Sequence, residues 1–261
     1  MKGVMAALRV ALRLFLICGW TLLFLSTALP AALVAMLKRD KGGPTDLSGN
    51  TPLARIWATG IGKIIGLTIE VRGQIPRSPF FLVSNHLGYV DTILLMSLVP
   101  SVFISTTEVR SWPVIGFLAQ LSGALFLNRD SPGHVRAINS QIKTALERGR
   151  GITLFPEGTS TRGDRILPFH SSLLEPALAG SRKISWACLT YETPPGEGPP
   201  GDVVCWWDKE QTFENHLFRL LSLPSFKGHV VFGAFHPCGL NRKEVARQLT
   251  EEVRKHFVPL T

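Results

Sequence analysis

The chain has 261 residues, a length that accommodates one large α/β domain together with a membrane segment. Its 28 Lys and Arg residues outnumber 19 Asp and Glu, which gives a net charge of +9, and the mean hydropathy of +0.20 is high for a soluble protein. A basic surface serves nucleic acid or anionic lipid. The sequence has an apolar N-terminus and lacks any nucleic-acid-binding motif, so we expect the lipid bilayer as a partner and exclude nucleic acid.

Residues 14–37 form the first predicted element, an uncharged stretch long enough to span a bilayer. Arg9 and Arg13 precede it and further cations follow it, so the positive-inside rule does not orient it. Pro30 interrupts the stretch. Two interpretations stay open: a single transmembrane helix, or a helix broken near Pro30 that re-enters or lies in one leaflet.

Three segments follow from this pattern. Residues 1–39 are the predicted membrane anchor, residues 40–50 a Gly- and Pro-containing linker, and residues 51–261 the main domain. Within that domain, residues 51–67 carry apolar side chains at helical spacing and predict a second helix at the membrane surface.

Strands and helices then alternate along the chain. Apolar runs predict strands at 68–71, 80–84, 102–105, 124–128, 152–155, 184–190, 203–207 and 229–235. Helical patterns cover 91–98, 132–148, 171–179, 213–221 and 242–257. This order predicts an α/β fold with a mostly parallel twisted sheet covered by helices.

The four cysteines are scattered, with no Cys-x-x-Cys pair and no histidine cluster at ligand spacing. We therefore expect free thiols, no metal site and no cysteine nucleophile.

A histidine and an aspartate stand five positions apart in Asn85-His86-Leu87-Gly88-Tyr89-Val90-Asp91, after a predicted buried strand. A carboxylate can fix the tautomer of a histidine and stabilise its protonated ring, which makes His86 a candidate general base. Helical positions five apart point about 140° away from each other, so the pair meets only if the chain bends, and Gly88 allows a bend. Taken alone, the segment favours a simpler interpretation, in which the histidine caps a helix and the aspartate opens it.

A polar turn later in the chain favours the interpretation of His86 as a general base. Residues 151–155 predict another buried strand, which runs into Pro156-Glu157-Gly158-Thr159-Ser160-Thr161-Arg162-Gly163. Small residues between a glutamate and an arginine at a strand end expose backbone N–H groups that can bind an oxyanion or a phosphate.

Together the two segments resemble the glycerophospholipid acyltransferase family, typified by 1-acylglycerol-3-phosphate acyltransferases. That family carries a His-x4-Asp motif and, about 70 residues later, a Phe-Pro-Glu-Gly-Thr motif. Here Glu157 follows His86 by 71 positions. An apolar strand that ends in Arg129 lies between them, as in the family, and the resemblance covers roughly residues 50–240.

The resemblance implies that a fatty acyl group passes directly from a thioester to the hydroxyl of a lysolipid. His86 would act as general base and Asp91 would orient it. No serine lies in a nucleophile elbow, so an acyl-enzyme is not expected. We expect no cofactor, because acyl-CoA or acyl-carrier protein enters as a co-substrate.

The resemblance also places acceptor binding on a second set of residues: Arg129, Glu157, Gly158, Thr159 and Arg162. Backbone N–H groups around Gly158 are candidates for the oxyanion site. Glu157 is alternatively a structural carboxylate that caps the turn, and the arginines are alternatively solvated surface charges. Residues 112–118 line an acyl tunnel or form an ordinary core helix.

Two departures from the family bear on the acceptor. Many phosphatidate-forming relatives have Lys where this chain has Thr106 and Arg where it has Ser160. Two other stretches resemble lyso-ornithine lipid acyltransferases instead: Gly158-Thr159-Ser160 followed by Arg165-Ile166-Leu167-Pro168-Phe169, and Trp206-Trp207-Asp208 leading to His216-Leu217. Lysophosphatidate is the first expected acceptor and a lyso-ornithine or other lyso-aminolipid the alternative.

Two interpretations from other classes are a catalytically silent, membrane-anchored lipid-binding protein and a lysolipid hydrolase. The expected donors are cytosolic, which places the active site on the cytoplasmic face of a membrane and favours a monotopic or hairpin-like anchor.

Overall fold

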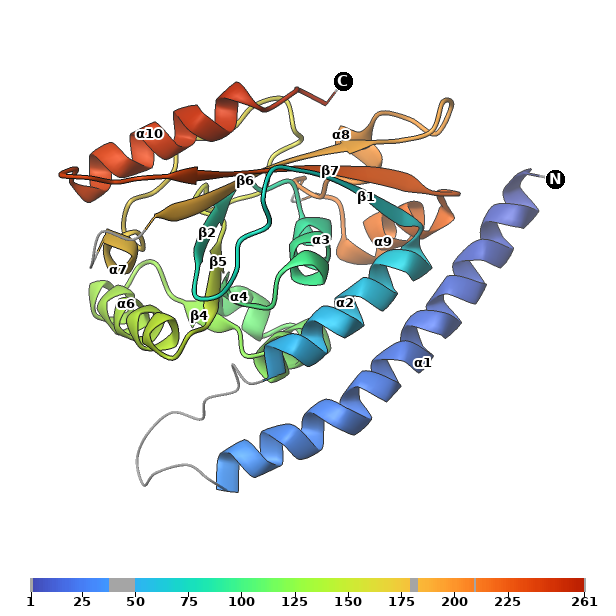
Figure 1. Cartoon of the computed structure of the whole chain (residues 1–261). Helices are drawn as coiled ribbons and strands as arrows, with labels where there is room; N and C mark the ends of the chain where they lie inside the picture. Colours follow the sequence, from blue (N-terminus) through green and yellow to red (C-terminus); the bar gives the residue numbers. More distant parts are fainter. Residues whose placement is uncertain (1, 38–49, 179–182, 209, 261) are drawn as a thin grey trace.

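A seven-stranded sheet forms the centre of the computed structural model, which describes residues 2–37, 50–178, 183–208 and 210–260 (Figure 1). The strand order is β1-β7-β6-β2-β5-β3-β4, and every neighbouring pair is parallel except β6 and β7. The strands are β1 (Leu67–Arg72), β2 (Phe81–Ser84), β3 (Ser101–Thr106), β4 (Leu125–Leu127), β5 (Gly151–Leu154), β6 (Ile184–Glu192) and β7 (Phe226–Phe235). The predicted α/β class with a mostly parallel sheet is confirmed.

Helices cover both faces of this sheet. They are α1 (Lys2–Leu37), α2 (Thr51–Ile65), α3 (Tyr89–Leu98), α4 (Thr107–Arg110), α5 (Ile115–Leu121), α6 (Pro132–Glu147), α7 (Glu175–Leu178), α8 (Pro200–Val203), α9 (Phe213–Ser222) and α10 (Arg242–Lys255). Side chains alternate across each strand. Leu82 of β2 therefore packs with the core under α2, α3 and α9, while Val83 packs with the core under α6 and α10. Burial on both faces explains why the central strands are continuous apolar runs.

Helix α1 lies beside α2, with the chain running in the opposite direction (Figure 1). The indole Nε1 of Trp20 donates a hydrogen bond of 2.9 Å to the Trp57 carbonyl, and Gly60 leaves room for that indole. α1 continues through Pro30, so of the two open interpretations of this stretch the structure shows the unbroken helix. By length and composition alone, Gly3–Ala35 could cross a membrane.

Two arginines hold α1 against the end of α9. The buried guanidinium of Arg13 donates to the carbonyls of Leu221, Leu223 and Pro224 at 3.0, 2.6 and 2.9 Å. Arg9 donates to the Ser222 carbonyl at 2.5 Å. The last carbonyls of a helix lack hydrogen-bond partners within the helix. A cation at this end is also attracted by the partial negative charge of the helix dipole. These arginines, which the sequence marks only as flanking charges, attach α1 to the domain.

Two predicted elements are wrong. The strand at 203–207 is absent, because Pro200 opens the short helix α8 and Val203, Val204 and Cys205 bury their side chains without joining the sheet. The helix at 171–179 shrinks to Glu175–Leu178, since Leu173 and Leu174 reach the core from a turn. Most of the predicted linker, residues 40–49, lies outside the described residues.

Candidate active site

The predicted bend between His86 and Asp91 is present. Helix α3 begins at Tyr89, with Gly88 before it at φ 154°. A β-carbon on Gly88 would lie 2.7 Å from the Trp206 nitrogen, so glycine is needed at this point. Asp91 in the first turn of α3 consequently faces back to the strand end, where its Oδ2 lies 2.9 Å from His86 Nδ1.

Asp91 is fully buried and its carboxylate is surrounded by donors. Oδ2 also accepts the backbone N–H groups of Leu87 and Gly88, at 2.5 and 3.0 Å, and Oδ1 accepts the Tyr191 hydroxyl at 2.7 Å. These bonds replace the water that a buried carboxylate loses. The ionised Asp91 accepts a hydrogen bond from His86 Nδ1, which fixes the histidine in the tautomer that carries its proton on Nδ1.

The imidazole of His86 is oriented on its other side by an aromatic ring. The Phe155 ring stacks on it with centroids 4.2 Å apart and an interplanar angle of 19°. The His86 side chain keeps 23% of its surface exposed. Because Nδ1 is bonded to Asp91, Nε2 is the nitrogen that can take a proton from a substrate.

Glu157 is brought next to His86, but through the backbone. Its Oε1 accepts the His86 N–H at 2.8 Å and its Oε2 accepts the Leu167 N–H at 2.7 Å. Burial raises the pKa of Glu157 to about 7, against the lowering effect of these two hydrogen bonds. With 3% of its surface exposed and both oxygens occupied, Glu157 fits the structural alternative better than direct contact with an acceptor.

The remaining predicted acceptor residues lie in the turn after β5 or pair with it. Arg129 Nη1 donates to the Gly158 carbonyl at 2.6 Å, and the Gly158 N–H donates to the Phe155 carbonyl at 3.3 Å within the turn. Thr159 is exposed. Arg162 is exposed and forms two hydrogen bonds with the Asp202 carboxylate, at 2.7 and 2.6 Å. Their proposed roles toward acceptor and oxyanion stay predictions.

An aromatic cluster beside α3 was not predicted. Tyr89, Trp112, Trp206 and Phe213 pack edge to face or tilted, with ring centroids 5.2–6.0 Å apart. The Trp206 N–H donates to the Leu87 carbonyl at 2.9 Å, which joins the cluster to the His86 segment. Trp112 belongs to the stretch predicted to line an acyl tunnel, and the half-buried rings supply an apolar surface near His86 and Asp91.

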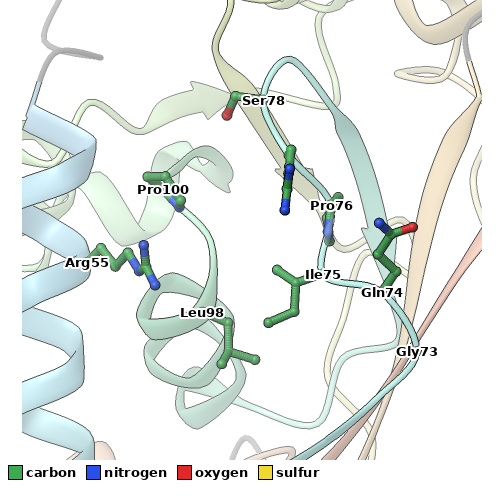
Figure 2. Close-up of a pocket in the computed structure, with 9 residues that line it drawn as sticks. Arg55, Gly73, Gln74, Ile75, Pro76, Ser78, Leu98 and Pro100 are labelled. Atoms are coloured by element: carbon green, nitrogen blue, oxygen red, sulfur yellow. The ribbon is translucent and has the colours of Figure 1, made fainter.

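A cavity of about 590 Å³ lies elsewhere (Figure 2). Arg55 of α2 lies on one side of it, and Ile75 and Pro76 of the β1–β2 connection lie on the other. Neither His86 nor Asp91 lines it. It begins at the entry end of β2, whereas His86 follows the exit end.

Comparison with known proteins identifies the class. The family model described as Acyltransferase matches residues 68–185. The chain is 34% identical over 257 residues to the lyso-ornithine lipid O-acyltransferase of Pseudomonas aeruginosa, covering 96% of this chain and 94% of that protein. It is 32% identical over 152 residues to the 1-acyl-sn-glycerol-3-phosphate acyltransferase of Neisseria gonorrhoeae, covering 56% and 60% of the two chains.

A solved structure shares the fold. The crystal structure of the 1-acyl-sn-glycerophosphate acyltransferase PlsC from Thermotoga maritima aligns with a TM-score of 0.63 at 17% identity, over 98% of this chain and 97% of that one. This chain therefore belongs to the acyltransferase family, and it is an acyltransferase of the kind that the His86 and Glu157 motifs predicted.

Proposed function

We propose that this protein transfers a fatty acyl group from an acyl thioester to the free hydroxyl of a lysolipid, with His86 as general base. The observation that carries the proposal is the His86 Nδ1 to Asp91 Oδ2 contact of 2.9 Å, with Asp91 fully buried. An alcohol is a poor nucleophile near neutral pH and needs a base within hydrogen-bond reach. The pair supplies such a base and leaves Nε2 free to face the acceptor.

The reaction needs no covalent enzyme intermediate. His86 Nε2 takes the proton as the acceptor oxygen bonds to the thioester carbonyl carbon. The negative charge moves to the carbonyl oxygen, where backbone N–H groups of the turn after β5 are candidate donors. Collapse breaks the carbon–sulfur bond, and the departing thiolate takes the proton from the imidazolium. Asp91 stabilises the imidazolium between these two steps.

Lysophosphatidate is the first acceptor we propose, with phosphatidic acid as product. Relatives named for this acceptor include the Neisseria gonorrhoeae protein. Arg129 and Arg162 are two cations near the turn. Arg162 already has a partner in Asp202, so a phosphate would share or replace that carboxylate.

A lyso-ornithine or other lyso-aminolipid is the second acceptor. The near full-length similarity to the Pseudomonas aeruginosa protein favours it. So does Ser160, which stands where many phosphatidate-forming relatives have an arginine and whose hydroxyl donates to the Trp206 carbonyl at 2.7 Å. Ser160 is neutral and its hydroxyl is bonded to the backbone, so it cannot pair with a phosphate as an arginine would.

The membrane is the proposed site of action, since α1 exposes many large apolar side chains. They are Val4, Met5, Leu8, Leu12, Phe15, Leu16, Leu22, Leu23, Leu29, Leu33, Val34 and Leu37. We place α1 in the bilayer and the active site on the cytoplasmic face, where acyl-CoA and acyl-carrier protein are found. The docking of Arg13 and Arg9 on α9 favours α1 lying along the domain over α1 extending away from it.

The test uses purified protein in detergent. Labelled acyl-CoA and acyl-carrier protein are each offered with lysophosphatidate, lysophosphatidylethanolamine and a lyso-ornithine lipid. We expect ester formation from at least one pair and its loss in His86→Ala. Turnover that survives His86→Ala would refute the general-base role. Free fatty acid without acceptor would point to a hydrolase, and lipid binding without turnover would point to a binding protein.

A matched pair of variants tests the acceptor site. If Arg162 binds an anionic headgroup, Arg162→Ala raises KM for that acceptor, whereas Asp202→Ala, which frees Arg162, does not. Equal effects of the two variants would mean that Arg162 serves only its bond with Asp202.

A further inference from the structure

The second oxygen of Asp91 is held by a residue that neither motif contains. Tyr191 lies near the end of β6 and is 3% exposed, and its hydroxyl donates a hydrogen bond of 2.7 Å to Asp91 Oδ1. Asp91 is on α3, 100 positions earlier in the chain. One tyrosine on the sheet thus bonds the carboxylate that a separate helix presents to His86.

Tyr191 is itself fixed by the sheet. It pairs with Gly228 on β7, where an added β-carbon would lie 3.3 Å from the Tyr191 ring, and Phe226 packs edge to face against it. Two residues earlier on β6, Leu189 exchanges two hydrogen bonds with the buried side-chain amide of Asn85, at 3.0 and 2.7 Å. β6 therefore holds both the residue before His86 and the partner of His86.

We propose that Tyr191 is a positioning residue of acyl transfer, which locks the rotation of the Asp91 carboxylate and sets how much of its charge reaches His86. The inference rests on the proposed role of His86 as general base. A carboxylate held at one oxygen only can turn about its terminal bond, so the His86 ring is less well aligned with the acceptor and kcat falls. A donor on Oδ1 also draws electron density away from Oδ2.

The electrostatic surroundings keep the hydroxyl a donor. Burial, and then the charge of Asp91, raise the pKa of Tyr191 well above its ordinary value. Other titratable groups that act on the same region are Glu157 after β5 and Cys205 after α8, and burial raises the pKa of both. Tyr191 thus stays protonated across the pH range of any assay.

The chain contains a matched control, because it has two tyrosines. The Tyr89 ring is half-buried, and its hydroxyl lies 2.9 Å from His216 Nδ1 and not against Asp91. Tyr191→Phe and Tyr89→Phe each remove one hydrogen-bonded hydroxyl. Steady-state kinetics of the full-length protein in detergent, measured across pH, compare the two variants with the wild type.

We expect Tyr191→Phe to lower kcat about tenfold, as for the loss of a hydrogen bond to a charged group, and to change KM by less than about twofold. The acid limb of the kcat/KM profile should move to higher pH, because Asp91 then stabilises the imidazolium more. Tyr89→Phe should leave that limb in place. An acid limb that is the same in both variants would overturn the proposal, since a structural role alone lowers stability without moving it.

A second measurement tests the same proposal if Tyr191→Phe fails to fold. In the Tyr89→Phe background Tyr191 is the one remaining tyrosine, so incorporation of 3-fluorotyrosine alters this donor alone. Fluorine makes the phenol a stronger donor at nearly unchanged size. The acid limb should then move to lower pH, and an unmoved limb would overturn the proposal. Turnover that survives His86→Ala would instead refute the general base, whatever Tyr191 does.

Discussion

Two buried groups near the active site should make opposite contributions to the dependence of stability on pH. Burial raises the pKa of Glu157 from 4.5 to about 7 and lowers the pKa of His216 from 6.5 to about 4. Both side chains are almost inaccessible, at 3% and 0% exposure. The perturbations that reveal the two contributions are Glu157→Gln and His216→Asn.

The sign follows from the protons that each state binds. Between pH 4.5 and 7 the folded protein keeps a proton on Glu157 that the unfolded chain has lost, so this group's contribution to stability falls as pH rises. Between pH 4 and 6.5 the unfolded chain holds a proton on His216 that the folded protein lacks, so this contribution rises with pH. Each pKa unit corresponds to about 1.4 kcal/mol, which gives about 3 kcal/mol for each group across the shared window.

The two contributions cancel in the wild type and separate in the variants. Between pH 4.5 and 6.5, Glu157→Gln should leave the rising contribution of His216, and His216→Asn should leave the falling contribution of Glu157. At roughly 2–4 °C per kcal/mol, the Tm difference from wild type should change by roughly 6–12 °C across the window, with opposite signs. Thermal unfolding in a detergent without titratable groups measures this difference.

The double variant is the control, because removing both groups should restore the pH profile of the wild type. If either single variant runs parallel to the wild type across the window, that group does not titrate as its burial implies. Slopes of the reverse sign would refute the reasoning for both.

Other substitutions have expected outcomes that simpler assays decide. Asp91→Asn keeps the size of the side chain but removes the charge beside His86, so kcat should fall about 10²–10⁴-fold in steady-state acyl transfer; a change below about threefold would remove Asp91 from the mechanism. Gly60→Ala should lower Tm, because its β-carbon would overlap the indole of α1 at 2.2 Å, whereas Gly62→Ala, with a nearest contact of 3.7 Å, should be neutral or stabilising. Equal Tm values would mean that α1 does not pack there. Arg13→Leu leaves three carbonyls without their donor and should lower Tm by several degrees and expose α1 to limited proteolysis; unchanged digestion would contradict the docking on α9.

The contact between His86 and Asp91 could be predicted from the sequence because its geometry is local. His86, Gly88 and Asp91 lie within one bend between a strand and a helix, and spacing alone shows that the bend is needed. The buried central strands could also be predicted, since burial on both faces leaves continuous apolar runs. Residues 203–207 are also a continuous apolar run, yet they do not form a strand. A buried segment need not pair in a sheet, so the apolar run alone predicts burial and not strand structure.

The contacts of Tyr191 and Glu157 around the His86 and Asp91 pair could not be predicted from the sequence. Tyr191 ends a strand in an unremarkable sequence, and its link to Asp91 depends on which strands are neighbours. The partners of Glu157 are the backbone N–H groups of His86 and Leu167, which exist in every sequence and carry no residue type. The motif thus marks Glu157 as a candidate site residue, but it does not predict that backbone N–H groups of the protein bond both carboxylate oxygens.

The order of the central strands explains how one site combines these residues. β6, β2 and β5 are neighbours in the sheet, and β2 is parallel to both others. Their exit ends meet, and they carry Tyr191, His86 and Glu157 respectively. The strand ends that hold His86, Tyr191 and Glu157 therefore belong to the buried centre of the sheet, and Asp91 of α3 is bonded to two of these residues.

The candidate acceptor residues have a different origin. Arg162 pairs with Asp202 on a peripheral segment, and Arg129 follows the edge strand β4. Such segments can change without disturbing the three central strand ends. The same catalytic pair can then serve acceptors with different headgroups. This agrees with a family whose members are named both for lyso-ornithine lipid and for 1-acylglycerol-3-phosphate. It also means that variants at Arg162 should act on KM for the acceptor, while variants at Tyr191 act on kcat, and the two kinds of effect should combine independently.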